Sequence, residues 1–143
     1  MLIEKQGEIF FQYGNACFMN DEPHEGLEYY NRAMSAGFDS DEMFFFMGMA
    51  YEHMNDDQMA LRYIQKAIMK NPSRADYKVK KVSVLLRLNM PEEAKKTIDD
   101  MLLNDPELFD GYHMKTMILL EEKKYSDAIK FSKEASRSFS RRC

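Results

Sequence analysis

Residues 41–74 read DEMFFFMGMAYEHMNDDQMALRYIQKAIMKNPSR, and this stretch decides the fold of the chain. In its first half Phe44, Met47 and Tyr51 recur at the three- and four-residue spacing that places side chains on one face of an α-helix. A second such face follows, made by Ala60, Ile64 and Ala67. Pro72 then closes the segment, because proline cannot continue a helix. The stretch therefore predicts two short helices joined by a turn, a helical hairpin.

This hairpin is repeated along the chain. Shifting the sequence by 34 residues brings the pattern into register again without an insertion or a deletion. Small residues then align in columns, which lets paired helices cross closely, and one column holds Gly26, Ala60, Ala94 and Ala128. The register predicts a single all-α array over residues 1–143 with repeats at 7–40, 41–74, 75–108 and 109–142. We expect eight helices of about 12–14 residues each.

Turn and cap residues support the same register. Pro23 and Pro91 occupy equivalent places just before the second helices of their hairpins, where a missing N–H costs nothing. Asp39 or Ser40 is a predicted N-cap of the following helix, and so is Ser73 in the next repeat. Both features predict helix starts at the places where the repeats require them.

The pattern resembles the tetratricopeptide repeat, which also has a period of 34 residues. The second repeat carries nearly all of that family's positions, at Gly48, Tyr51, Ala60, Ala67 and Pro72. The third and fourth repeats match at Ala94, Ile98, Pro106, Tyr112, Ala128 and Ala135. The resemblance covers residues 7–142. It implies a right-handed superhelical α-solenoid whose first helices line a concave groove for protein partners.

The charge of the chain is unevenly divided. Residues 1–71 hold 12 acidic and 5 basic side chains, giving −7, while residues 72–143 hold 12 acidic and 15 basic side chains, giving +3. An acidic first half argues against a nucleic-acid partner, which would need a continuous basic face. The simplest interpretation is two solvated surfaces of different charge. The alternative is head-to-tail self-association through complementary ends.

Cysteine usage and hydropathy bear on location. Cys17 and Cys143 do not make a disulfide framework, which favours a reducing compartment. The first residues lack the apolar centre of a signal peptide, and no segment approaches the roughly 20 apolar residues of a membrane span. We expect a cytoplasmic protein without a membrane partner, although a fragment trimmed from a longer protein would have the same features.

The sequence gives little sign of catalysis. His24, His53 and His113 lie in three different repeats, and no two have the spacing that places ligands on one helix face. Cys17 falls in an apolar stripe without a nearby basic partner, as an inert buried thiol would. There is no glycine-rich phosphate loop. We therefore expect no enzyme activity, no metal site and no cofactor.

The groove that the resemblance implies would be lined by the flank of each first helix that internal packing does not use. Its predicted partner-binding residues are Phe11, Asn15, Phe18, Met19, Phe45, Phe46, Met49, His53, Val79, Lys80, Leu86, Arg87, His113, Met114, Met117 and Leu120. Many are apolar. Because the opposite flank of residues 41–53 already supplies core side chains, Phe45, Phe46 and Met49 form a second apolar stripe on that helix.

Two interpretations of this stripe are open. The stripe either binds an apolar or aromatic peptide or helix, or packs against neighbouring first helices as ordinary core. The 13 methionines of the chain would suit a conformable binding surface. If the stripe binds a partner, the double substitution of Phe45 and Met49 by alanine should weaken capture and leave the helices intact.

One variant of the family captures the terminal carboxylate of a chaperone tail with lysines and asparagines. Asn15 and Lys80 stand at the corresponding places in this chain. Phe11 and Phe46, however, replace the expected lysine and asparagine, and Asp76 replaces another lysine. A carboxylate at Asp76 would repel the ligand, so binding of a chaperone tail is disfavoured.

The preferred hypothesis is a non-catalytic scaffold or adaptor that binds protein or peptide. The first alternative is a dimer or an end-to-end assembly through the last hairpin, which lacks a further solvating helix and could leave Phe131 and Phe139 facing outward. That end could equally be followed by more repeats, or fray. The second alternative is a regulatory or docking fragment of a larger protein.

Overall fold

The computed structural model describes the backbone of residues 2–140 and the side chains of residues 5–137. Within this range the chain is all-helical. Its helices are α1 (Leu2–Met19), α2 (Pro23–Ser35), α3 (Asp41–His53), α4 (Asp57–Lys70), α5 (Ala75–Arg87), α6 (Pro91–Asn104), α7 (Phe109–Glu121) and α8 (Tyr125–Ser140). The predicted all-α fold with eight helices is confirmed for this part of the chain.

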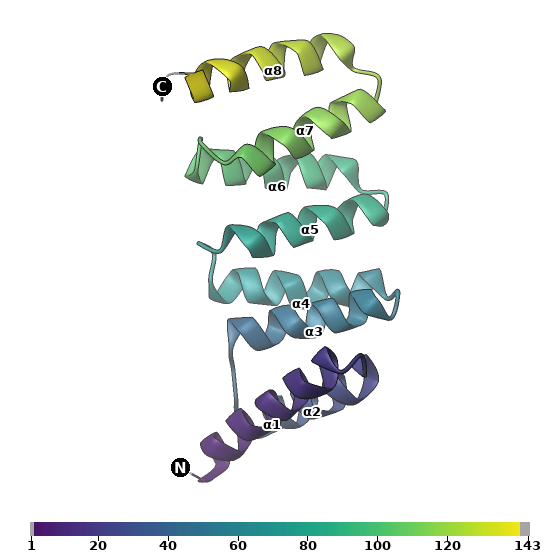
Figure 1. The fold of residues 1–143 in the computed structure, drawn as a ribbon, viewed down its shortest axis with the longest axis vertical. Coiled ribbons are helices and arrows are strands. Elements are labelled where there is room, and N and C mark those ends of the chain that lie inside the picture. Colours follow the sequence, from purple (N-terminus) through teal and green to yellow (C-terminus); the bar gives the residue numbers. More distant parts are fainter. Residues whose placement is uncertain (1, 141–143) are drawn as a thin grey trace. The chain divides into compact units, whose positions relative to one another are not determined.

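The helices keep the period of the sequence. Helices α3, α5 and α7 begin at residues 41, 75 and 109, each 34 residues after the last, and α2, α4, α6 and α8 keep the same interval. Figure 1 shows consecutive helices running back and forth as hairpins. The expected length is wrong for two helices, since α1 has 18 residues and α8 has 16. The first helix of the first repeat is therefore longer than the first helices of the other repeats.

The helix ends agree only partly with the predicted caps. Pro23 and Pro91 lie in the first turns of α2 and α6, as expected. Ser40, not Asp39, is the N-cap of α3, but its side chain makes no capping hydrogen bond. The prediction for Ser73 is wrong, because α5 begins at residue 75 and the Ser73 hydroxyl donates to the Asn71 side chain at 2.8 Å.

The chain divides into two compact units, Met1–Tyr77 and Lys78–Cys143. The first unit contains α1 to α4 and the first turn of α5. Its core holds large, fully buried side chains, among them Tyr30, Met43 and Met47. Gly48 permits the close crossing of α3 and α4, since a Cβ there would lie 2.7 Å from Ile64 Cγ1. This is the tight crossing that the columns of small residues predicted.

The second unit contains the rest of α5 and α6 to α8. Its buried side chains include Ile98, Ile118 and Leu119. Gly111 lies against Leu102, because an added Cβ would be 2.8 Å from Leu102 Cδ2. Helices α6 and α7 thus approach closely near the start of α7.

The last hairpin departs from one expectation. Phe131 does not face outward: it is half-buried, with its ring 5.3 Å from that of Tyr112 and 4.8 Å from Lys115 Nζ. A cation over an aromatic face is a favourable contact, so the lysine helps to cover the ring. Phe139 lies outside the residues whose side chains the structure describes.

Candidate protein-binding surface

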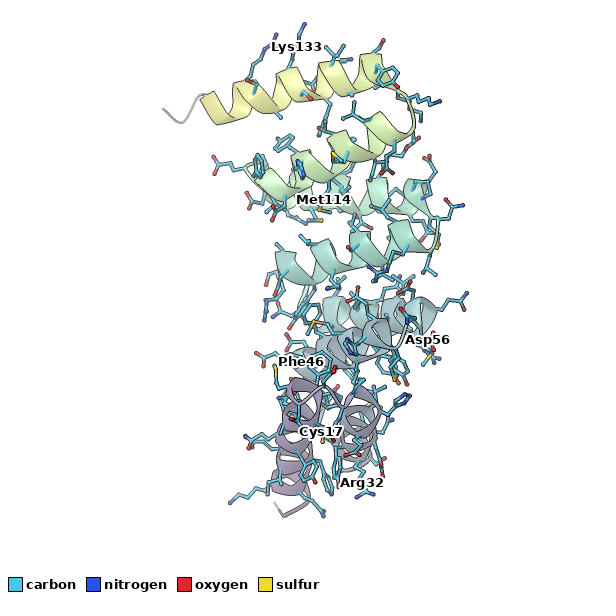
Figure 2. The ribbon with its side chains drawn as sticks, turned by 45° about the vertical axis from the view of Figure 1, so that its right-hand side comes forward. Cys17, Arg32, Phe46, Asp56, Met114 and Lys133 are labelled. Atoms are coloured by element: carbon cyan, nitrogen blue, oxygen red, sulfur yellow. The ribbon has the colours of Figure 1, made fainter. Side chains whose placement is uncertain are left out.

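In the first unit, the predicted groove residues of α1 and α3 come together. The ring of Phe46 lies 6.4 Å from that of Phe11 and 6.2 Å from that of Phe18, measured between centroids. Figure 2 labels Phe46, which α3 holds beside α1. All three rings are half-buried. The two first helices of this unit therefore share one aromatic cluster.

Much of this cluster is tied to the core. The ring of Phe45 lies 4.5 Å from that of Tyr77, which is fully buried, and Phe11 stacks on Phe38 at 5.1 Å. Such contacts are those of side chains that stabilise the fold. Truncating Phe45 would therefore disturb the core as well as any bound partner. For this reason more exposed residues make the better probes of binding.

A hollow of about 280 Å³ opens at the ends of α1 and α3. Phe18, Met19 and His53 line it together with Asp21 and Pro23. Met19 is 70% exposed, whereas Phe18 is half-buried. The rim carries an ion pair in the protonated state of the histidine, since His53 Nε2 lies 2.8 Å from Asp21 Oδ1. An apolar floor with a polar rim is the usual form of a binding hollow.

Asn15 has a structural partner in the same unit. Its Oδ1 accepts a hydrogen bond of 2.6 Å from the Tyr30 hydroxyl. Burial raises the pKa of that hydroxyl, so it stays protonated and keeps donating. The oxygen of Asn15 is therefore used to satisfy a buried tyrosine.

In the second unit, α7 carries the most exposed of the predicted residues. His113, Met117 and Leu120 follow one face of the helix; Met117 is 48% exposed and Leu120 is 43% exposed. The His113 ring stacks on Phe109 with centroids 6.0 Å apart. The other predicted residues here divide by exposure: Leu86 and Arg87 are exposed, and Val79, Lys80 and Met114 are half-buried.

One polar contact of the first unit was not predicted from the sequence. Asp41 Oδ2, at the start of α3, accepts a hydrogen bond of 2.7 Å from the Tyr77 hydroxyl and a longer one of 3.4 Å from Asn71 Nδ2. The tyrosine bond, with help from Asn71, lowers the pKa of Asp41. Arg74 covers the Tyr77 ring, with its guanidinium carbon 4.5 Å from the centroid. The partners are 36 positions apart in the sequence, which hides this pair from local pattern analysis.

The setting of Cys17 agrees with its predicted burial. Cys17 is buried, and burial raises the pKa of its thiol, with Glu22 and Glu25 adding to the effect. These three residues are also the one group of potential metal ligands within 4.8 Å of one another in the described part of the chain. A protonated thiol is a poor ligand and a poor nucleophile. His24 is exposed.

None of the helices between residues 2 and 140 is both long and apolar enough to cross a bilayer.

Comparison with known proteins identifies the architecture. Residues 41–73 match the family model of the tetratricopeptide repeat. The fold is similar to that of MamA (TM-score 0.81, 18% identity, 95% of this chain and 80% of MamA) and of YrrB, described as a tetratricopeptide-repeat protein with an unusual peptide-binding site (0.76, 18%, 90% and 66%). It is also similar to the first such domain of Spaghetti (RPAP3), solved with the HSP90 peptide SRMEEVD (0.72, 19%, 84% and 95%). No curated protein matches by sequence.

Within the described residues, α2 to α8 recur at a constant 34-residue interval, which defines a helical-repeat fold. The structural likenesses establish which repeat fold it is, and residues 41–73 carry its sequence signature. The chain has the tetratricopeptide-repeat fold.

Proposed function

We propose that this chain is a non-catalytic protein-interaction module that holds an apolar or aromatic peptide or helix against its first helices. The observation that carries the proposal is the apolar surface on those helices: Met19 on α1, and Met117 and Leu120 on α7, are at least 43% exposed. Single exposed apolar residues are common, but these three are among the residues that the resemblance to the family assigns to the partner-binding flank of the first helices. A cytoplasmic location and a single array of four repeats belong to the same proposal.

The fold neighbours support the general class of function. The Spaghetti (RPAP3) domain holds a peptide, and YrrB is described by its peptide-binding site. Covering three or four apolar side chains would contribute about 1.5–3 kcal/mol each, before the costs of association. Dissociation constants in the micromolar range are therefore expected, as a reversible adaptor needs.

An acidic chaperone tail is a poor candidate for this surface. Two hydrogen bonds from Arg74, at 2.9 and 2.7 Å, hold the Asp76 carboxylate and lower its pKa, so the group is charged at neutral pH. Phe11 and Phe46 meet each other where the carboxylate-binding variant has polar side chains. We expect SRMEEVD to bind at least 10-fold more weakly than peptides with aromatic and aliphatic anchors, in fluorescence anisotropy at equal peptide length.

The proposal is tested with an array of unbiased peptides probed with the purified chain. Selected peptides should be enriched in Phe, Leu, Ile and Met. A peptide that binds the first unit should lose at least 10-fold in affinity in the Met19→Glu variant, and one that binds the second unit should lose as much in the Leu120→Glu variant. Met69→Glu is the matched control, because Met69 is 82% exposed but lies on α4, outside the predicted surface. Selection of acidic peptides, or equal loss of affinity in the control, would overturn the proposal.

A further inference from the structure

Helix α1 exposes apolar side chains at positions that are buried in the next repeat. Ile9 is 63% exposed and Tyr13 is 52% exposed. The residues 34 positions later, Met43 and Met47, are both fully buried. Both belong to the core cluster that also holds Leu27, Tyr30 and Ala33 of the preceding hairpin, and α3 contacts α2 of that hairpin. We use the word joint for the packing contact between two consecutive repeats. The surface formed by Ile9 and Tyr13, here called the head surface, therefore resembles one side of such a joint.

Helices α7 and α8 expose the other side of such a joint. Ile129 on α8 is 58% exposed. Its equivalents in two earlier repeats are covered: Leu27 is 6% exposed, and the side chain of Lys95 is 13% exposed. Phe109, at the start of α7, is 63% exposed. We call the exposed residues Phe109, His113, Ile129 and Lys133 the tail surface.

A contact inside the first unit shows how the two surfaces would match. Tyr77 is contacted by Asp41, through the 2.7 Å hydrogen bond, and by Phe45, at 4.5 Å between ring centroids. Shifting Asp41 and Phe45 by two periods gives Phe109 and His113 of the tail surface. Shifting Tyr77 back by two periods gives Ile9 of the head surface. An aliphatic side chain would thus meet a stacked aromatic pair.

A second contact, inside the second unit, gives the polar part of the match. Lys115 Nζ on α7 lies 2.7 Å from Asp99 Oδ1 on α6. The equivalents of these residues in a joint between tail and head are Tyr13 and Lys133. Figure 2 shows Lys133 on the side of α8 that points away from α7. The ammonium group of Lys133 would then face the ring of Tyr13, and a cation facing an aromatic ring is an attractive pair. This pair would take the place of the Lys115–Asp99 ion pair of the internal joint.

From this register we propose that a second copy of the chain covers the tail surface with its head surface, continuing the repeat from one copy to the next. Charge favours this occupant, because residues 1–71 carry −7 and residues 72–143 carry +3. The contact is heterologous: any assembly keeps one uncovered head surface and one uncovered tail surface, so association builds open chains whose length grows with concentration. This inference does not depend on the peptide-binding proposal.

The test distinguishes this head-to-tail contact from a symmetric contact, in which two copies would meet through the same surface. Sedimentation velocity of the 16.9 kDa chain at about 100 μM should show species larger than a monomer. Ile9→Glu blocks the head and Ile129→Glu blocks the tail, and each variant alone should be a monomer. An equimolar mixture of the two variants retains one intact head and one intact tail, so it should form a dimer. A symmetric interface predicts no such rescue.

Controls guard against trivial loss of association. Leu103→Glu introduces the same charge at a residue that is 80% exposed and outside both surfaces, and it should associate like the parent chain. Circular dichroism should show equal helix content in all variants. Raising the salt concentration from about 0.05 to 0.5 M should weaken association, since charges of opposite sign are screened. A monomeric parent chain, a monomeric mixture, or loss of association in the Leu103 variant would overturn the proposal.

Discussion

The Asp41–Tyr77 hydrogen bond is the single side-chain contact with the clearest effect on stability. Replacing Asp41 by asparagine removes a charged acceptor from a buried hydroxyl. Hydrogen bonds to charged groups contribute about 1.5–3 kcal/mol, so the free energy of unfolding should fall by about that amount at pH 7. Urea unfolding followed by circular dichroism measures the change. Asp39→Asn is the control, because its ion pair with Lys70 is exposed and should be worth less than about 1 kcal/mol.

The same bond predicts a pH dependence. Because the fold lowers the pKa of Asp41, the carboxylate is stabilised in the folded chain relative to the unfolded one. The contribution is fully present above the unfolded value of about 3.9 and is lost as the pH falls below it toward the folded pKa. The difference in unfolding free energy between parent and Asp41→Asn should therefore be constant from about pH 5 to 7 and shrink below pH 4. A difference that grows in acid would contradict the assignment.

At the scale of a helix, the repeat to which a residue belongs decides whether its side chain is buried, more than its position within the repeat does. Leu27 and Ile129 occupy the same place in α2 and α8, but only Leu27 is buried. Leu27→Ala should cost about 2–4 kcal/mol in urea unfolding, whereas Ile129→Ala should cost less than about 1 kcal/mol when the chain is dilute and monomeric. Equal losses would show that α8 has the same cover as α2.

The limits of sequence reasoning also lie at this scale. Spacing alone predicted the helices and the flank that Phe45 and Phe46 occupy, because helical periodicity fixes direction around an axis. It did not predict that Phe45 stacks on Tyr77, since that contact depends on the separation of two helices. Exposure of Ile9 and Tyr13 was also missed. Comparing them with the residues 34 positions later would have found apolar equivalents, but only the structure shows which members of the column are covered.

For the molecule as a whole, we predict that the two compact units unfold together. Their boundary, between Tyr77 and Lys78, falls inside α5, and Tyr77 belongs to the core of the first unit. Unfolding one unit alone would leave α5 cut within its first turn, with backbone groups lacking helical partners. Two signals distinguish the cases. Far-ultraviolet circular dichroism reports all the helices, whereas tyrosine fluorescence reports mainly the first unit, which holds six of the eight tyrosines, at residues 13, 29, 30, 51, 63 and 77.

The two signals should give one urea midpoint for the parent chain. Lys78→Pro should separate them, because proline removes a helical hydrogen bond at the boundary and disrupts α5. The fluorescence midpoint of that variant should stay close to the parent value, and the dichroism curve should gain an earlier transition from the second unit. Lys96→Pro is the matched control. Lys96 is an exposed residue of α6, so its replacement disrupts a helix that lies wholly inside the second unit and away from the boundary. Two separate midpoints in the parent chain would mean that the units fold independently.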